Sequence, residues 1–147
     1  MTEVRPLRVR IRAPRIFVFQ CLSTFDRSSP VWCTGFEPQI LDQDGDALVV
    51  RFRERTLGRL VSSVVRIRMR PPDCIEEELL DGVLAGLRES LVLSGEGDSS
   101  TSVVWSAELA VRVPVAAGPI ERLCASRMLR TDAQRSLDRY RVTIEAA

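Results

Sequence analysis

The stretch Leu7–Phe19, LRVRIRAPRIFVF, brings two periodicities together and sets the start of the fold. Aliphatic residues and arginines alternate over its first six positions, which is typical of a strand with one buried and one solvated face. Ala13-Pro14 ends the alternation, and proline suits the first turn of a helix. The sequence therefore predicts a strand, a short helix over about 14–22, and a second short helical or irregular stretch over about 24–33.

Six more strands and a long helix are expected after residue 35. Turn signals such as Asp44-Gly45-Asp46 and Asp81-Gly82 separate the strands, because glycine tolerates the positive φ of tight turns. Helical periodicity begins near Pro119 and continues without glycine or proline to the last residue. The expected strands are 37–42, 47–55, 60–70, 74–80, 87–93 and 101–113.

Only the C-terminal helix is long enough to cover the apolar face of such a sheet. About 26 helical residues would run roughly 39 Å, which is enough to cross seven curved strands. The predicted fold class is α+β: a seven-stranded curved antiparallel sheet, two short helices after the first strand, and a long C-terminal helix packed across the sheet.

Composition limits the chemistry open to this chain. Its 147 residues, 45% of them hydrophobic and 28% charged, have the size and balance of one globular domain, so a single domain over 1–147 is expected. Histidine and lysine are both absent, which excludes a Ser-His-Asp triad, a histidine-ligated metal and a Schiff-base lysine. Acid–base work would fall to Asp, Glu, Cys or the lone Tyr140.

Targeting and metal signals are missing as well. No apolar run reaches the roughly 20 residues that span a bilayer, and the first twelve residues lack the apolar core of a signal peptide, so a cytoplasmic protein is expected. The cysteines at 21, 33, 74 and 124 show no CxxC spacing, so no metal site and no cofactor is expected. Buried thiols are the ordinary interpretation, and a Cys21–Cys33 disulfide stays open.

Three segments resemble the START-like superfamily, whose members share the helix-grip fold. Ile11–Phe19 is similar to the opening strand and first helix of that family, with its I-x-A-P-x-x-x-V-F pattern. Pro30-Val31-Trp32 resembles the tryptophan that closes the second short helix, although Cys33 stands where a histidine often follows. Glu77–Leu84, continued from Leu87 to Trp105, resembles the hairpin region of the polyketide cyclase/dehydrase and coenzyme Q-binding branch. The resemblance spans essentially the whole chain and implies a hydrophobic ligand cavity between sheet and helix.

Arginine repeats at every second position on three predicted strands, and these faces are expected to be solvated. Residues 1–70 carry 13 arginines against 7 acidic residues, whereas 71–147 carry 8 against 13. Glu76 and Glu78 would lie beside the arginines of the neighbouring strand, so the basic and acidic halves are expected to meet on one outer surface. That surface is either an ordinary solvated face or a protein or ribosome contact formed by Arg51, Arg53, Arg66 and Arg68.

The opposite, apolar faces are expected to line the interior, and three carboxylates interrupt them. These are Glu54 after Phe52, Glu89 between Leu87 and Leu91, and Glu77 beside Ile75. A carboxylate inside an apolar cavity is costly unless paired and its pKa tends to rise, which makes it a candidate functional group. The alternative is that each faces water at the mouth of the cavity. Arg127, on the long helix, could be the partner of one of them.

Glu54, Glu89 and Tyr140 are weak candidates for catalysis. The candidate ligand-contacting residues are Trp32, Phe36, Phe52, Glu54, Met69, Glu89, Leu91, Trp105, Leu109, Leu123, Arg127 and Met128.

Three functions stay open at this point. The first is non-enzymatic binding or transport of a lipid, isoprenoid quinone or polyketide-like molecule, which needs only an apolar cavity with a few polar anchors. The second is a polyketide cyclase/dehydrase-type enzyme that uses cavity carboxylates. The absence of histidine argues against this alternative. The third is a protein or ribosome interaction module that uses the arginine-rich face. Whichever function holds, a monomer or a homodimer is expected.

Overall fold

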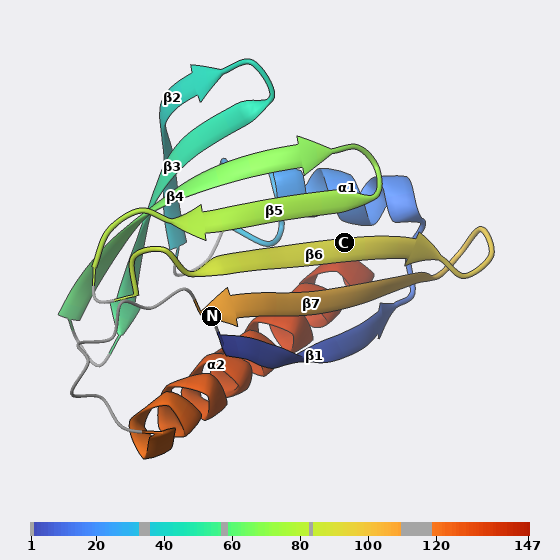
Figure 1. The fold of residues 1–147 in the computed structure, drawn as a ribbon. Helices are drawn as coiled ribbons and strands as arrows, with labels where there is room; N and C mark the ends of the chain where they lie inside the picture. The colour runs from blue at the N-terminus through green and yellow to red at the C-terminus, as the bar shows by residue number, and fades with distance from the viewer. Residues whose placement is uncertain (1, 33–35, 57–58, 83, 110–118) are drawn as a thin grey trace.

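The computed structural model describes residues 2–32, 36–56, 59–82, 84–109 and 119–147. Seven strands and two helices occur in this part of the chain (Figure 1). In chain order they are β1 (Thr2–Ile11), α1 (Arg15–Ser23), β2 (Phe36–Asp44), β3 (Ala47–Thr56), β4 (Arg59–Arg70), β5 (Cys74–Leu79), β6 (Arg88–Gly95), β7 (Thr101–Leu109) and α2 (Pro119–Glu145).

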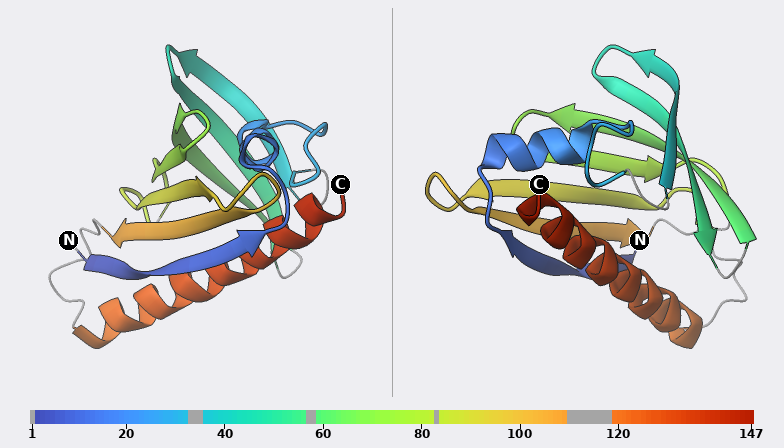
Figure 2. Two further views of the ribbon diagram at one scale, coloured as in Figure 1. Left: turned by 90° about the vertical axis from the view of Figure 1, so that its right-hand side faces the viewer. Right: turned by 180° about the vertical axis from the view of Figure 1, so that it is seen from behind.

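The seven strands form one sheet in the order β1-β7-β6-β5-β4-β3-β2, and every neighbouring pair is antiparallel. The sheet curves around α2, which runs diagonally across one of its faces (Figure 2). We call the face toward α2 the inner face and the opposite one the outer face. The predicted α+β architecture with a long C-terminal helix is confirmed.

The segment after α1 corrects one expectation. Residues 24–32 run through bends and turns, so α1 is the only short helix that the described residues contain before β2. Turn chemistry explains this: the Asp26 carboxylate accepts the backbone N–H of Ser28 at 2.7 Å, and Pro30 has no N–H to donate. The Ser29 hydroxyl donates to the carbonyl of Cys21 and ties the segment back to α1.

Alternating residues of the strands build the core on the inner face, as the pattern in β1 shows. Val9 and Ile11 are buried, whereas the arginines between and after them are exposed. The helix contributes a stripe at spacings of three and four, which is one face of an α-helix. Its members are Leu129, Ala133, Leu137, Tyr140 and Ile144.

Two hydrogen bonds fasten the end of β1 to distant parts of the chain. The backbone N–H of Arg12 donates to Oε1 of Glu145 at 2.9 Å, and the Thr101 hydroxyl donates to the carbonyl of Ala13 at 2.8 Å. The C-terminal end of α2 is thereby held against the strand on which it lies. Neither α1 nor α2, as far as the structure describes them, has the length and hydropathy that a membrane-crossing helix requires.

Candidate functional site

Two glutamates lie side by side on the inner face. Glu77 of β5 pairs directly with Glu89 of β6, and the row continues to Ile67 of β4 on one side and Ala107 of β7 on the other. Both flanking residues are buried in the core, at 0% and 4% exposure. Cross-strand partners share a face of the sheet, so the two carboxyl groups face the side that α2 covers.

The surroundings of this pair favour protonation. Burial, and secondarily the charge of Glu89, raises the pKa of Glu77 from 4.5 to about 8. Burial also raises the pKa of Glu89, against which a hydrogen bond from the Trp105 side chain acts to lower it. Because the two groups titrate together, the pair retains a proton at neutral pH, and Glu89 is the better placed of the two to carry the negative charge.

Tyr140 of α2 lies within the electrostatic reach of the pair. Burial raises the pKa of its phenol and the charges of Glu77 and Glu89 raise it further, whereas Arg139 lowers it. The Arg139 side chain hydrogen-bonds to Tyr140, and its Cζ lies 5.2 Å from the centre of the ring. The phenol therefore stays neutral, as a hydrogen-bonding group on the helix side of the interior.

An aromatic cluster lies next to Tyr140. The Trp32 ring has its centre 5.9 Å from that of Tyr140 and 5.3 Å from that of Phe52. Phe25 completes the cluster, at 5.8 Å from Trp32 and 5.9 Å from Phe52. Tilted and edge-to-face pairs of this kind are the preferred aromatic geometries. The interior therefore combines ring faces with the carboxyl pair, and Tyr140 belongs to both groups.

Most of the candidate ligand-contacting residues lie on the inner side. Trp105, Leu91 and Leu109 are buried, and Met69 and Phe52 pack against the core. The side chains of Phe36, Glu54 and Leu123 lie outside the described residues. The structure thus brings Glu89, Trp105 and Tyr140 together, with Trp32 and Phe52 beside them.

Two candidates on the helix are placed wrongly by the sequence pattern. Met128 is 69% exposed and Arg127 is exposed too, so neither contributes to the interior. The reason is helical phase: Leu129, one residue later, lies on the stripe that continues through Leu137. Arg127 therefore does not pair with an interior carboxylate, and Arg139 is the arginine of α2 next to Tyr140.

Sequence reasoning missed Phe25 and Arg139. Phe25 lies in the irregular segment after α1, where no periodicity assigns a face. Arg139 is not part of the alternating arginine pattern of the strands. The only feature of the sequence that points to it is its position next to Tyr140. Cys21, one half of the possible disulfide, is a buried free thiol, and Cys33 lies outside the described residues.

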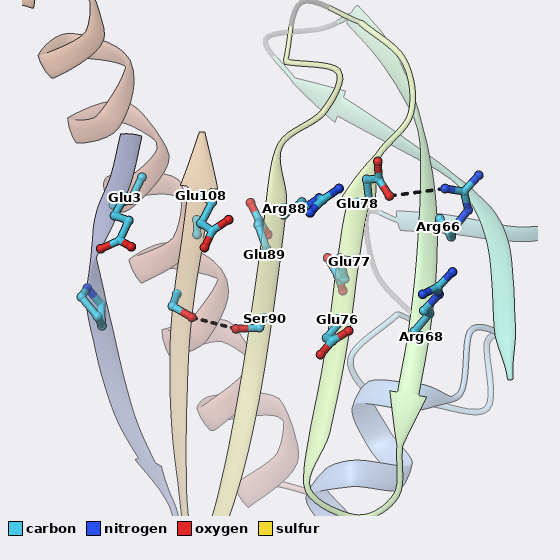
Figure 3. Close-up of a pocket in the computed structure, with 14 residues that line it drawn as sticks. Glu3, Arg66, Arg68, Glu76, Glu77, Glu78, Arg88, Glu89, Ser90 and Glu108 are labelled. Atoms are coloured by element: carbon cyan, nitrogen blue, oxygen red, sulfur yellow. Dashed lines mark hydrogen bonds and ion pairs between the residues drawn. The ribbon is translucent and has the colours of Figure 1, made fainter. Parts of the chain in front are cut away.

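A hollow of about 620 Å³ lies over β1 and β4 to β7 on the outer face (Figure 3), and Glu77, Glu89 and Ala107 are among the residues that border it. Arg66 Nη1 lies 3.3 Å from Glu78 Oε2, and the hydroxyls of Ser90 and Ser106 are 2.7 Å apart. Arginines and glutamates thus interleave on neighbouring strands as expected, and exposed pairs of this kind contribute about 1 kcal/mol or less. Within the described ranges, no group of three or more Cys, Asp or Glu side chains is arranged to hold a metal ion.

Comparisons with known proteins give structural matches only. No family model matches the chain, and no curated protein sequence matches it. The di-domain ARO/CYC BexL from the BE-7585A biosynthetic pathway superposes with a TM-score of 0.72 at 16% identity, and this chain covers 50% of it with 99% of its own residues. The chain therefore spans half the length of that protein.

Two further solved structures match along nearly their whole length. The Zhui aromatase/cyclase from Streptomyces sp. R1128 has a TM-score of 0.73 at 16% identity, with 99% of this chain and 92% of that chain covered. A START superfamily protein from Mycobacterium smegmatis has a TM-score of 0.68 at 18% identity, with 95% and 97% covered. Together with the strand order and the position of α2, these matches show that the chain has the START-like helix-grip fold.

Proposed function

We propose that this chain binds a hydrophobic small molecule between the inner face of the sheet and α2, without catalysing a reaction on it. The observation that carries the proposal is the Glu77–Glu89 pair on an otherwise apolar face, joined by Trp105 and Tyr140. Small-molecule sites are mostly apolar and contain a few convergent polar groups that orient the ligand. A lipid, isoprenoid quinone or polyketide-like molecule has the required character.

The aromatic cluster supports the same proposal. Trp32 and Phe52 present large apolar surfaces next to the polar Tyr140. The pair also makes little sense as a stabilising feature, because burying a carboxyl without a full set of partners costs free energy. Such a cost is tolerated where the group serves a ligand.

The tryptophans of the chain can report ligand binding through their fluorescence. Its two tryptophans, Trp32 and Trp105, both lie in the interior. We expect the neutral fluorescent probe N-phenyl-1-naphthylamine to bind, to accept energy from the tryptophans and to be displaced by 1-decanol. Ala107→Trp, on the inner row beside Glu89, should block uptake, whereas Ser106→Trp, on the outer face, should not. Equal uptake by both variants, with their circular dichroism unchanged, would sink the proposal.

A second candidate is an acid–base enzyme like the aromatase/cyclases whose structures match. The observation in its favour is that Glu77 has a pKa of about 8 and faces Glu89, which is favoured as the charged partner. Two carboxyls whose environments separate their proton affinities can act as an acid and a base near neutral pH.

Incubation with a linear poly-β-ketone tests this candidate. Enzymatic cyclisation would give aromatic product above the spontaneous rate, and Glu77→Gln and Glu89→Gln would each remove it while leaving probe binding in place. A product rate equal to that of buffer alone would eliminate the enzyme and leave the binding protein.

A further inference from the structure

The charge balance of the interior restricts which ligand can enter. Glu77 faces it from β5 and Glu89 from β6; β7 adds the neutral Trp105 and β4 the apolar Ile67. From α2, the neutral phenol of Tyr140 interacts electrostatically with both carboxyls, and the guanidinium of Arg139 lies beside the ring of Tyr140. Arg139 influences the pKa of Tyr140, whereas within the described part of the chain the two carboxyls are affected by burial, by the charge of Glu89 on Glu77 and by the hydrogen bond from Trp105 to Glu89.

The contrast with the outer face is direct. On the same strand, Glu76 and Glu78 point the other way and pair with Arg70 and Arg66, at 3.2 and 3.3 Å. Figure 3 shows Glu76, Glu77 and Glu78 in succession along β5, beside the arginines of β4. Among the described residues, the interior glutamates interact with each other and with the indole of Trp105, so any charge that the pair carries is negative.

A second feature favours positive charge in the ligand. The rings of Trp32, Phe52 and Tyr140 pack together on the side of the interior that Tyr140 shares with the pair. The faces of aromatic rings attract cations, and tryptophan does so most strongly. Ring faces and carboxylates thus favour the same kind of head group, although they come from different elements of the fold.

We propose that the interior selects an amphiphile with an ammonium head group and rejects the same hydrocarbon chain when it ends in a carboxylate. The proposal rests on the binding function above and names the chemical class of its ligand. The ammonium lies against Glu77 and Glu89, with the hydrocarbon chain along the apolar inner face. A carboxylate in that position would meet like charge in a medium of low dielectric constant, which weakens its binding at least about tenfold relative to a neutral head.

Proton linkage gives the proposal a signature that packing alone cannot produce. A permanently charged ammonium replaces the proton that the pair shares, so binding releases protons from the protein. Its affinity should therefore rise as the pH increases toward 8, where the pair loses its proton without help. A neutral alcohol of the same length should show no such rise.

Three ten-carbon probes test the inference by titration calorimetry below their micellar concentrations: decyltrimethylammonium, 1-decanol and decanoate. At pH 7 we expect the ammonium to bind at least tenfold more tightly than the alcohol, and the alcohol at least tenfold more tightly than decanoate. The double variant Glu77→Gln/Glu89→Gln should bring the three affinities within about threefold of one another. The matched control Glu76→Gln/Glu78→Gln, on the outer face of β5, should keep the wild-type order.

The outcomes separate this inference from the function on which it rests. If 1-decanol binds and decyltrimethylammonium binds no more tightly, the selectivity is refuted and the binding function stands. If none of the three binds, the binding function itself is refuted, and the selectivity with it. Should the double variant lose its fold, the pH dependence in the wild-type protein decides alone: an ammonium affinity that is flat between pH 6 and 8.5 overturns the inference.

Discussion

Replacing Glu77 with glutamine should stabilise the protein at alkaline pH and change little at pH 5. Glutamine is close in shape to the protonated acid and cannot ionise, so it preserves the form that the interior favours. The folded-state pKa of Glu77 is raised from 4.5 to about 8 by burial and by the charge of Glu89. Well below pH 4.5 the carboxyl is protonated in both folded and unfolded chains, so its ionisation does not affect folding there.

Between pH 4.5 and 8 the unfolded chain ionises Glu77 and the folded protein resists ionisation. The folded state then binds more protons than the unfolded one, so the free energy of unfolding falls as the pH rises. A tenfold change in proton affinity is worth about 1.4 kcal/mol, so the full interval amounts to about 5 kcal/mol as an upper limit. Relaxation of the interior and entry of water reduce this, and we expect a difference of about 2–5 kcal/mol between variant and wild type at pH 8.5.

Urea unfolding at pH 5, 6.5, 8 and 9 measures this difference directly. Taking the variant minus the wild type cancels the titrating groups that do not interact with Glu77, so the difference reports on Glu77 together with its coupled partner Glu89. Glu76→Gln, one residue away on the outer face, is the matched control and should show a pH-independent difference of less than about 1 kcal/mol. Parallel pH profiles for Glu77→Gln and wild type would mean that Glu77 is solvated, and the interior placement would be refuted.

Three further substitutions probe the core, a buried hydrogen bond and the outer face. Leu93→Ala removes a side chain that is 2% exposed and should cost about 2–5 kcal/mol in urea unfolding. Thr101→Val removes the hydroxyl that donates to the Ala13 carbonyl and should cost about 1–3 kcal/mol, seen as a lower melting temperature in calorimetry. Arg66→Ala breaks the pair with Glu78 and should change stability by less than about 1 kcal/mol, with the difference vanishing at 1 M salt.

The alternation of apolar residues and arginines makes the strand predictions reliable, because a shift of one residue would turn every arginine of a strand toward the core. The predicted strand over 60–70 corresponds to β4 (Arg59–Arg70) and that over 74–80 to β5 (Cys74–Leu79). Pro71 and Pro72 lie between the two strands and have no backbone N–H to donate to a neighbouring strand. They therefore fix the end of β4 and the start of β5. The long helix follows in the same way from the uninterrupted period that ends in the buried Ile144.

Local pattern fails where the backbone has no regular period or where the phase must be carried over many turns. The segment after α1 holds Trp32 and Phe25 in the core without any repeating spacing, because its side chains bond to its own backbone. On α2, Met128 and Ile144 are sixteen residues apart, and at 3.6 residues per turn they fall on nearly opposite faces. Because the apolar stripe of the sequence is broad, the pattern alone does not show that Met128 lies outside the face of α2 that packs on the sheet.

The site depends on the register between neighbouring strands, and the sequence of one strand does not determine that register. Alternation already puts Glu77 on the face of Ile75 and Glu89 on that of Leu91, but it does not place either carboxyl opposite the other. The contact arises because the turn between β5 and β6 sets their pairing, so that Glu77 and Glu89 meet as direct partners. The direct partner of Glu89 on β7 is Ala107. Trp105 lies two residues before Ala107 on the same strand, and its side chain hydrogen-bonds to Glu89.

The two faces of β5 carry the same residue type with opposite energetic consequences. Glu76 and Glu78 are solvated and paired with arginines, so they stabilise the sheet slightly and could be replaced with little effect. Glu77, between them, faces the core, where a leucine would bury apolar surface without the cost of desolvating a carboxyl. A fold that needed only stability would gain from that leucine. The carboxyl pair is therefore better explained by the ligand-binding function that we propose than by the stability of the sheet, and it is the part of this molecule on which ligand experiments should concentrate.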